Sequence, residues 1–326
     1  MAEVARVVAH SRFARGNIPA AVEAFRRALR LAPDCVPVMR ELAVCHFSAG
    51  DLQAASTLLE HCLAADPRDV ESLAKAAEIK CRIGAHAEAL RLGKLALAEE
   101  PLMPEATIAC LRAALGLGDL RFVEDLSRKV LAEGAAIPAW LNDVATETYS
   151  VAPAVSEALV RRALAIAPND PVLLLHLGHI LCDKLACAES ARCHEQALLV
   201  APGAAEIYNS YGILLETQGD YPGAAYKFTE ALRLNPELAE AHSNLGGVLR
   251  KMGRNEEALA AIREAIRVAP ENASGYGQLG VVLSWLGRNV DAESGYRQAY
   301  LLSDEAGRGK ARTDLSTALL ATGRHR

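Results

Sequence analysis

The sequence predicts an all-α fold, a solenoid of about nine helical hairpins followed by one further helix. Prolines recur every 34 residues over most of the 326-residue chain, which is the period of a helical-hairpin repeat. A glycine recurs between successive prolines, where a turn between two helices needs a residue that tolerates positive φ. Hydrophobic residues make up 51% of the chain but aromatic residues only 5%, which indicates an interior rich in Ala and Leu.

Residues 239–270 show the pattern of one hairpin. Residues three and four apart share a face of a helix, and this segment contains two such stripes. The first stripe is His242, Leu245, Gly246 and Leu249, and the second is Ala258, Ile262, Ala265 and Ile266. Gly253 lies between the stripes at the turn, and Pro270 ends the second helix because it has no N–H to donate. Glycine inside a helix costs about 1 kcal/mol relative to alanine, so we expect Gly246 to lie at a close helix crossing.

These residues resemble the tetratricopeptide repeat, a hairpin with Leu-Gly in its first helix, a turn Gly, two Ala and a closing Pro. At three consensus places the chain has a different residue of similar burial: His242 for Trp, Leu249 for Tyr and Ile262 for Phe. The resemblance implies a right-handed α-α superhelix in which the first helices line a concave groove. It also implies that the protein binds a protein or peptide along that groove.

The predicted repeats follow one another along the whole chain. They begin near residues 2, 36, 70, 104, 138, 171, 205, 239 and 273. The fifth repeat has a turn that is one residue shorter and lacks glycine, and the sixth has Leu185 in place of the turn glycine. No Ser/Gly-rich or Pro-rich linker interrupts the series, so we expect residues 1–326 to form a single continuous solenoid.

A tenth first helix is predicted at 309–322, without a second helix to cover it. Leu315, Leu319 and the turn glycine Gly323 have the consensus spacing, after a two-residue slip in phase that follows Asp304. A single unpartnered helix of about this length is marginal in water. We therefore expect the chain to be a piece of a longer protein, or to self-associate through this helix.

The resemblance places part of each first helix on the groove. The candidate peptide-binding residues at these places are Arg40, Arg82, Arg112, His176, His179, Asn209, Asn244, Arg250 and Trp285. A clamp for a C-terminal carboxylate does not fit, because Glu41 stands where the clamp needs an Asn and would repel the ligand. An asparagine ladder does not fit either, because Asn244 is the one Asn in its column of places. We expect the ligand to be an extended peptide or a helix.

Two patterns imitate cofactor or metal sites. Gly275, Gly277 and Gly280 spell G-x-G-x-x-G, but no strand precedes them and Gly280 is the packing glycine of its repeat. A cluster of possible metal ligands consists of His176, His179, Cys182, Cys187, Cys193 and His194. We expect Cys187 to lie in the turn and His194 to be buried on a different face, so the cluster would not converge. With no hydrolase, metalloprotease or P-loop motif, the sequence predicts a non-enzymatic protein with no cofactor and no bound metal.

Charge and hydropathy argue against some classes of partner. A net charge of −5 and a pI near 6.0 argue against a nucleic-acid surface. The sequence has no apolar run long enough to span a membrane and no signal peptide. We therefore expect a cytoplasmic protein whose eight cysteines are reduced.

Three roles remain open from the sequence. The first is a scaffold that binds a protein or peptide along its groove. The second is the N-terminal substrate-recognition arm of a larger transferase, because the C-terminal repeats are similar to bacterial arrays that precede glycosyltransferase or sulfotransferase domains. The third is a self-assembling scaffold.

Overall fold

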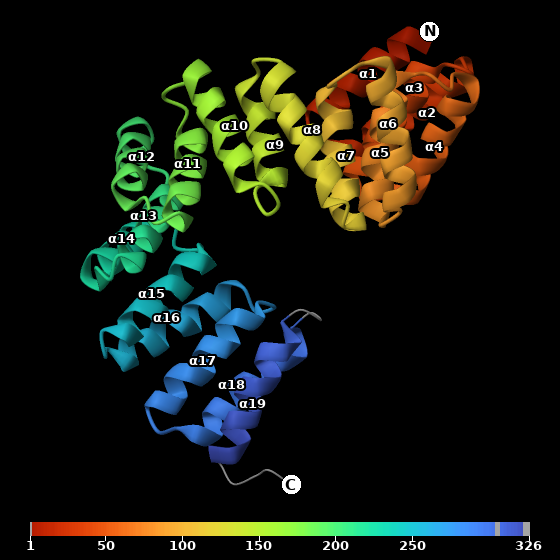
Figure 1. Cartoon of the computed structure of the whole chain (residues 1–326). Helices are drawn as coiled ribbons and strands as arrows, with labels where there is room; N and C mark the ends of the chain where they lie inside the picture. Colours follow the sequence, from red (N-terminus) through yellow and green to blue (C-terminus); the bar gives the residue numbers. More distant parts are fainter. Residues whose placement is uncertain (1, 304–306, 322–326) are drawn as a thin grey trace. The chain divides into compact units, whose positions relative to one another are not determined.

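The computed structural model describes residues 2–303 and 307–321, which form nineteen α-helices and no strand (Figure 1). The helices are α1 (Ala2–Ala14), α2 (Ile18–Leu31), α3 (Val36–Ser48), α4 (Leu52–Ala65), α5 (Val70–Ile83), α6 (His86–Glu99), α7 (Pro104–Leu117), α8 (Leu120–Glu133), α9 (Pro138–Thr148), α10 (Pro153–Ile166), α11 (Pro171–Asp183), α12 (Cys187–Val200), α13 (Ala205–Thr217), α14 (Tyr221–Leu234), α15 (Ala239–Lys251), α16 (Asn255–Val268), α17 (Ala273–Trp285), α18 (Asn289–Leu302) and α19 (Arg308–Ala321). Every predicted hairpin start coincides with the first residue of an odd-numbered helix, so the all-α hairpin series is confirmed.

The turns within the hairpins have the predicted backbone. The seven glycines at these turns, Gly16, Gly50, Gly84, Gly118, Gly219, Gly253 and Gly287, all have φ between +72° and +85°. Leu185, which replaces the glycine in the sixth hairpin, also has a positive φ, of 58°. In the fifth hairpin the shorter turn closes with a bond from Ala152 N–H to the Thr148 carbonyl, 2.9 Å long. The sequence of that turn therefore changes its geometry, whereas Leu185 adopts the geometry of the glycine it replaces.

Close helix crossings explain the glycines inside the first helices. A Cβ on Gly246 would lie 2.5 Å from Ile262 Cγ1 of the paired second helix. The same crossing pairs Gly178 with His194, Gly212 with Phe228 and Gly280 with Tyr296, where a Cβ would lie 2.6–2.7 Å from the partner ring. One large residue of each second helix thus packs on the bare backbone of the first. The prediction that Gly246 marks a crossing is confirmed.

The chain divides into two compact units, Met1–Ala167 with α1 to α10 and Pro168–Arg326 with α11 to α19. In the first unit, apolar clusters form around Phe25 and around Leu59 and Leu73. In the second unit they form around Phe228 and around Ile262 and Leu283. Each unit has its own core, and a single continuous solenoid over 1–326 stays a prediction.

The last described helix, α19, packs against the core of the second unit. Ala318 belongs to the Ile262 cluster and Leu315 packs against it, while Ala311 is also buried. The predicted bounds of 309–322 are thus close to those observed, and the helix is docked on α18. The predicted turn glycine Gly323, Asp304 and the side chain of Leu320 lie outside the described residues.

The structure corrects the predicted position of Cys187. Cys187 is the first residue of α12 and is not in the turn, because the turn ends at Ala186, the residue before the helix.

Among residues 2–303 and 307–321, no helix combines the length and the apolar character that crossing a bilayer requires.

Candidate functional site

The first unit contains a groove on three successive first helices. Its volume is about 540 Å³, and its walls come from α5, α7 and α9 with contributions from His86 and Ile137. The residues that line it are Lys75, Glu78, Cys81, Arg82, His86, Pro104, Glu105, Ile108, Ala109, Arg112, Ile137, Ala139, Trp140 and Asp143. We refer to it as the α5–α7–α9 groove. The groove therefore lies mainly on first helices.

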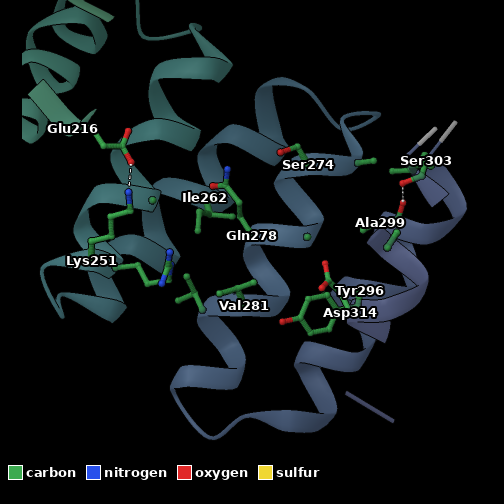
Figure 2. A pocket seen from close by; sticks show the side chains of 18 residues that line it. Glu216, Lys251, Ile262, Ser274, Gln278, Val281, Tyr296, Ala299, Ser303 and Asp314 are labelled. Carbon is green, nitrogen blue, oxygen red and sulfur yellow. Dashed lines mark hydrogen bonds and ion pairs between the residues drawn. The ribbon is translucent and has the colours of Figure 1, made fainter. Parts of the chain in front are cut away.

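The second unit contains a larger groove of about 770 Å³ (Figure 2). It lies mainly on α15, α17 and α19, and α13, α16 and α18 each contribute to the wall. Gln278, Val281 and Lys251 are on first helices, whereas Ile262 and Tyr296 reach it from second helices. We refer to it as the α15–α17–α19 groove.

Several polar residues predicted for the groove in the first unit are paired with the next repeat. Arg112 Nε donates to Glu147 over 2.7 Å, a step of 35 residues along the chain. Arg6 donates to Glu41 in the same way, with Nη2 2.8 Å from Oε1. Arg40 contacts Asp69 at 2.6 Å. These bonds fasten one first helix to the next.

The second unit has the same kind of bond. Asn244 Nδ2 donates to Asn209 Oδ1 over 3.1 Å, and Lys251 Nζ donates to Glu216 over 2.9 Å, each across 35 residues. Figure 2 shows the second of these at the edge of the α15–α17–α19 groove. Asn209 is only 6% exposed. Its amide therefore joins repeats and is not free to meet a ligand, so it is better described as a structural residue.

Three of the predicted residues form no hydrogen bond or ion pair with a neighbouring repeat among the described residues. Arg82 lines the α5–α7–α9 groove and lies over the Phe47 ring, 5.1 Å from its centroid. Arg250 lines the α15–α17–α19 groove and has no hydrogen-bond or ion-pair partner among the described residues. Trp285, the last residue of α17, is 69% exposed. These side chains are the ones that a ligand can engage without breaking a bond between repeats.

One histidine of α11, His179, lies beside a buried histidine of α12, His194. His194 is fully buried, with Nδ1 2.7 Å from the Ser190 carbonyl and Nε2 2.7 Å from the Ser210 hydroxyl. Because a carbonyl only accepts, Nδ1 carries the proton and Nε2 accepts from Ser210. Burial lowers the pKa of His194 to about 4. His179 is exposed, with its ring centroid 6.3 Å from that of His194, and His176 is half-buried.

The predicted histidine and cysteine cluster does not converge on one point. Both nitrogens of His194 are already hydrogen-bonded inside the core. Across the described ranges, no three His, Cys, Asp or Glu side chains gather as the ligands of a metal ion would. In the G-x-G-x-x-G pattern, Gly280 packs against Tyr296 and Gly275 lies near Ile266, whereas a Cβ on Gly277 would meet nothing within 4 Å.

Three groove residues outside the nine candidate binding residues have buried polar atoms without a partner among the described residues. They are Trp140 Nε1 and His86 Nδ1 in the α5–α7–α9 groove and Gln278 Oε1 in the α15–α17–α19 groove. Buried polar groups in folded proteins are normally paired. The sequence does mark Trp140 in one way, because it is one of only two tryptophans in the chain.

Comparison with known proteins agrees with this architecture. One tetratricopeptide repeat model matches residues 12–79 and 215–279, and a second tetratricopeptide repeat model matches residues 186–239. No curated protein matches the chain. The matched segments lie in both units and include the turn glycines Gly16, Gly50, Gly219 and Gly253 and the packing glycines Gly212 and Gly246. The chain is therefore a tetratricopeptide repeat protein.

Proposed function

We propose that this protein is a non-enzymatic interaction scaffold that holds a peptide segment of a partner along the grooves of its first helices. Tetratricopeptide repeats in general mediate binding between proteins, and the repeat models match this chain. The observation that carries the proposal is that each unit has a groove, of about 540 Å³ in the first unit and about 770 Å³ in the second, that lies mainly on first helices of successive repeats. An extended peptide or a helix can contact several such helices at once.

The bonds between repeats narrow the contacts that such a ligand would use. Arg112, Arg40 and Asn209 already have partners in the neighbouring repeat. Breaking such a bond would offset part of any gain from the ligand. Arg82, Arg250 and Trp285 have no hydrogen bond or ion pair between repeats to break, although Arg82 stacks on Phe47 of the preceding repeat. Arginine and tryptophan often dominate binding energy at interfaces. We therefore assign the binding contacts first to these three residues.

The test is a peptide selection on the full chain, followed by affinity measurements on matched variants. Arg82→Ala and Arg250→Ala should each weaken binding of a selected peptide about fivefold or more. Arg91→Ala on α6 and Arg263→Ala on α16 remove the same charge from exposed sites outside the two grooves, and should leave affinity within about twofold. Equal losses from both pairs of variants would refute binding in the grooves.

The narrower roles named from the sequence stay proposals. A recognition arm of a glycosyltransferase or sulfotransferase would use the same grooves, and extending the sequence along its gene tests it. Self-association through α19 predicts a mass that rises with concentration. Light scattering of the purified chain measures that mass, and a constant monomer mass would contradict self-assembly.

A further inference from the structure

Trp140 presents a buried hydrogen-bond donor in the wall of the α5–α7–α9 groove. The side chain is 4% exposed, and Nε1 has no acceptor among the described residues. The opposite edge of the indole packs on Gly134, where a Cβ would lie 3.0 Å from Cη2 and Cζ3. The missing side chain of Gly134 thus makes room for the ring, and the buried nitrogen of this groove-lining residue is left without a partner.

A second ring in the same wall is also without a partner. His86, the first residue of α6, has a buried Nδ1 that no described atom pairs with. Its ring lies against Gly116 of α7, where a Cβ would be 2.6 Å away. Two residues from different helices that line one groove therefore each carry a buried, unpaired ring nitrogen. Because buried N–H groups are costly to leave unpaired, a polar atom supplied from outside would stabilise this wall.

The rest of the groove indicates which polar atom fits. Apolar surface comes from Pro104, Ile108, Ala109, Ile137 and Ala139. The charged residues balance, with the cations Lys75, Arg82 and Arg112 against the carboxylates Glu78, Glu105 and Asp143. Lys75 pairs with Glu78 at 3.0 Å, and Arg112 pairs with Glu147. A groove with balanced charge and apolar walls favours a neutral acceptor that is attached to an apolar group.

We propose that the α5–α7–α9 groove takes an apolar residue from within a bound peptide chain, with a main-chain carbonyl of that peptide accepting from Trp140 Nε1–H. This assignment rests on the proposed function and states the chemistry of the partner at one groove. An internal residue supplies both features, because its side chain is apolar and its amides carry no charge. Nε1 is covered in the free protein, so a wall side chain moves aside when the carbonyl arrives.

The first experiment uses the indole as a reporter. Trp140 and Trp285 are the two tryptophans, so Trp285→Phe leaves a single indole N–H signal in the nitrogen-proton spectrum of the full chain. The probe is N-acetyl-leucine N-methylamide, which carries neutral amide carbonyls and an apolar side chain. We expect a saturable downfield shift of the indole signal. N-acetyl-glycine N-methylamide, which lacks the side chain, and N-acetyl-leucine, which carries a carboxylate, should need at least fivefold more probe.

Two variants distinguish the contribution of the Trp140 hydrogen-bond donor from that of the open space in the groove. The methyl groups of Ile108 and Ile137 serve as a second reporter of binding. Trp140→Phe keeps an aromatic ring and removes the donor, so the dissociation constant should rise about fivefold, as expected for one neutral hydrogen bond. Ala139→Tyr fills the groove from an exposed position and should abolish the methyl shifts.

Each other result overturns the assignment. Methyl shifts with an unmoved indole signal would show that no carbonyl reaches Trp140. Equal binding of the glycine probe would show that the groove does not recognise an apolar side chain. An absence of all shifts would refute the site itself. Peptides selected on the full chain that bind Ala139→Tyr unchanged would refute this groove while leaving the proposed scaffold function in place.

Discussion

Two adjacent glycines of α15 have opposite surroundings. Gly246 faces Ile262 at the helix crossing, whereas a Cβ on Gly247 would meet nothing within 4 Å. Gly247 instead lines the α15–α17–α19 groove. The same residue type therefore serves packing at one position and leaves open space at the next.

This pair gives a matched test of the crossing. Gly246→Leu should lower the free energy of unfolding by about 1–3 kcal/mol, because the added side chain overpacks the contact with Ile262. Gly247→Leu should leave it unchanged or raise it by up to about 1 kcal/mol, because leucine favours the helix more than glycine does. Urea denaturation of both variants measures the difference. A Gly246→Leu variant as stable as the original protein would contradict the crossing.

The buried His194 makes stability depend on pH. Its pKa in the folded protein is about 4 because burial disfavours the charged ring, whereas an unfolded histidine titrates near 6.5. Between these values the unfolded chain binds a proton that the folded chain does not. The stabilisation is thus fully present above about pH 6.5 and is lost as the pH falls toward 4, with a total of order 3 kcal/mol.

Phe228 occupies the equivalent place in the next repeat, so His194→Phe is the natural control. The variant should lose this part of the pH dependence when melting is followed from pH 7 to pH 4. The difference between the two proteins isolates His194 from other groups that titrate in the same range. Parallel curves for the two proteins would show that His194 does not contribute.

At the scale of the element, the hairpins other than the fifth have a turn residue with positive φ, and Leu185 occupies this position in the sixth hairpin. A non-glycine residue with positive φ is strained by about 1–2 kcal/mol. Leu185→Gly should therefore raise the free energy of unfolding by about 0.5–1 kcal/mol, after the entropy cost of glycine is subtracted. Gly253→Ala, at a φ of +77°, should have the opposite effect, of about 1 kcal/mol. Denaturation curves that move in the same direction for both would contradict the role of the turn.

The helices and their bounds could be predicted because they depend on local pattern. The turn glycines and the packing glycine Gly246 follow from the pattern within one hairpin, and the period of 34 residues follows from comparing successive hairpins. Side-chain partners could not be predicted in the same way. Glu41 was interpreted only as a residue that would repel a carboxylate ligand, whereas in the structure it accepts from Arg6.

The binding residues were harder to identify for the same reason. Asn209 and Arg40 occupy places that the resemblance assigns to a ligand, but a residue 29 or 35 positions away binds them first. The role of Trp140 depends on the missing hydrogen-bond partner of Nε1. Neither the presence of a distant partner nor its absence is visible in the local pattern of one repeat.

At the scale of the whole molecule, contacts between neighbouring repeats make stability local. In such repeat proteins each repeat contacts chiefly its neighbours, and this chain forms two units with separate cores. Gly246→Leu should therefore speed amide hydrogen exchange in α15 to α18 and leave protection in α1 to α10 within about twofold. Mass spectrometry of exchange resolves the two regions. Equal loosening of both units would contradict local stability.

The bonds across 35 residues also affect how the molecule responds to force. Each bond, such as Arg112 to Glu147 or Lys251 to Glu216, joins only neighbouring repeats. When the chain is pulled from its ends, these fasteners bear the load in series, so the weakest repeat interface yields first. Each release frees one repeat of 34 residues, which adds about 12 nm of extended chain. The protein would therefore lengthen under tension in steps of equal size.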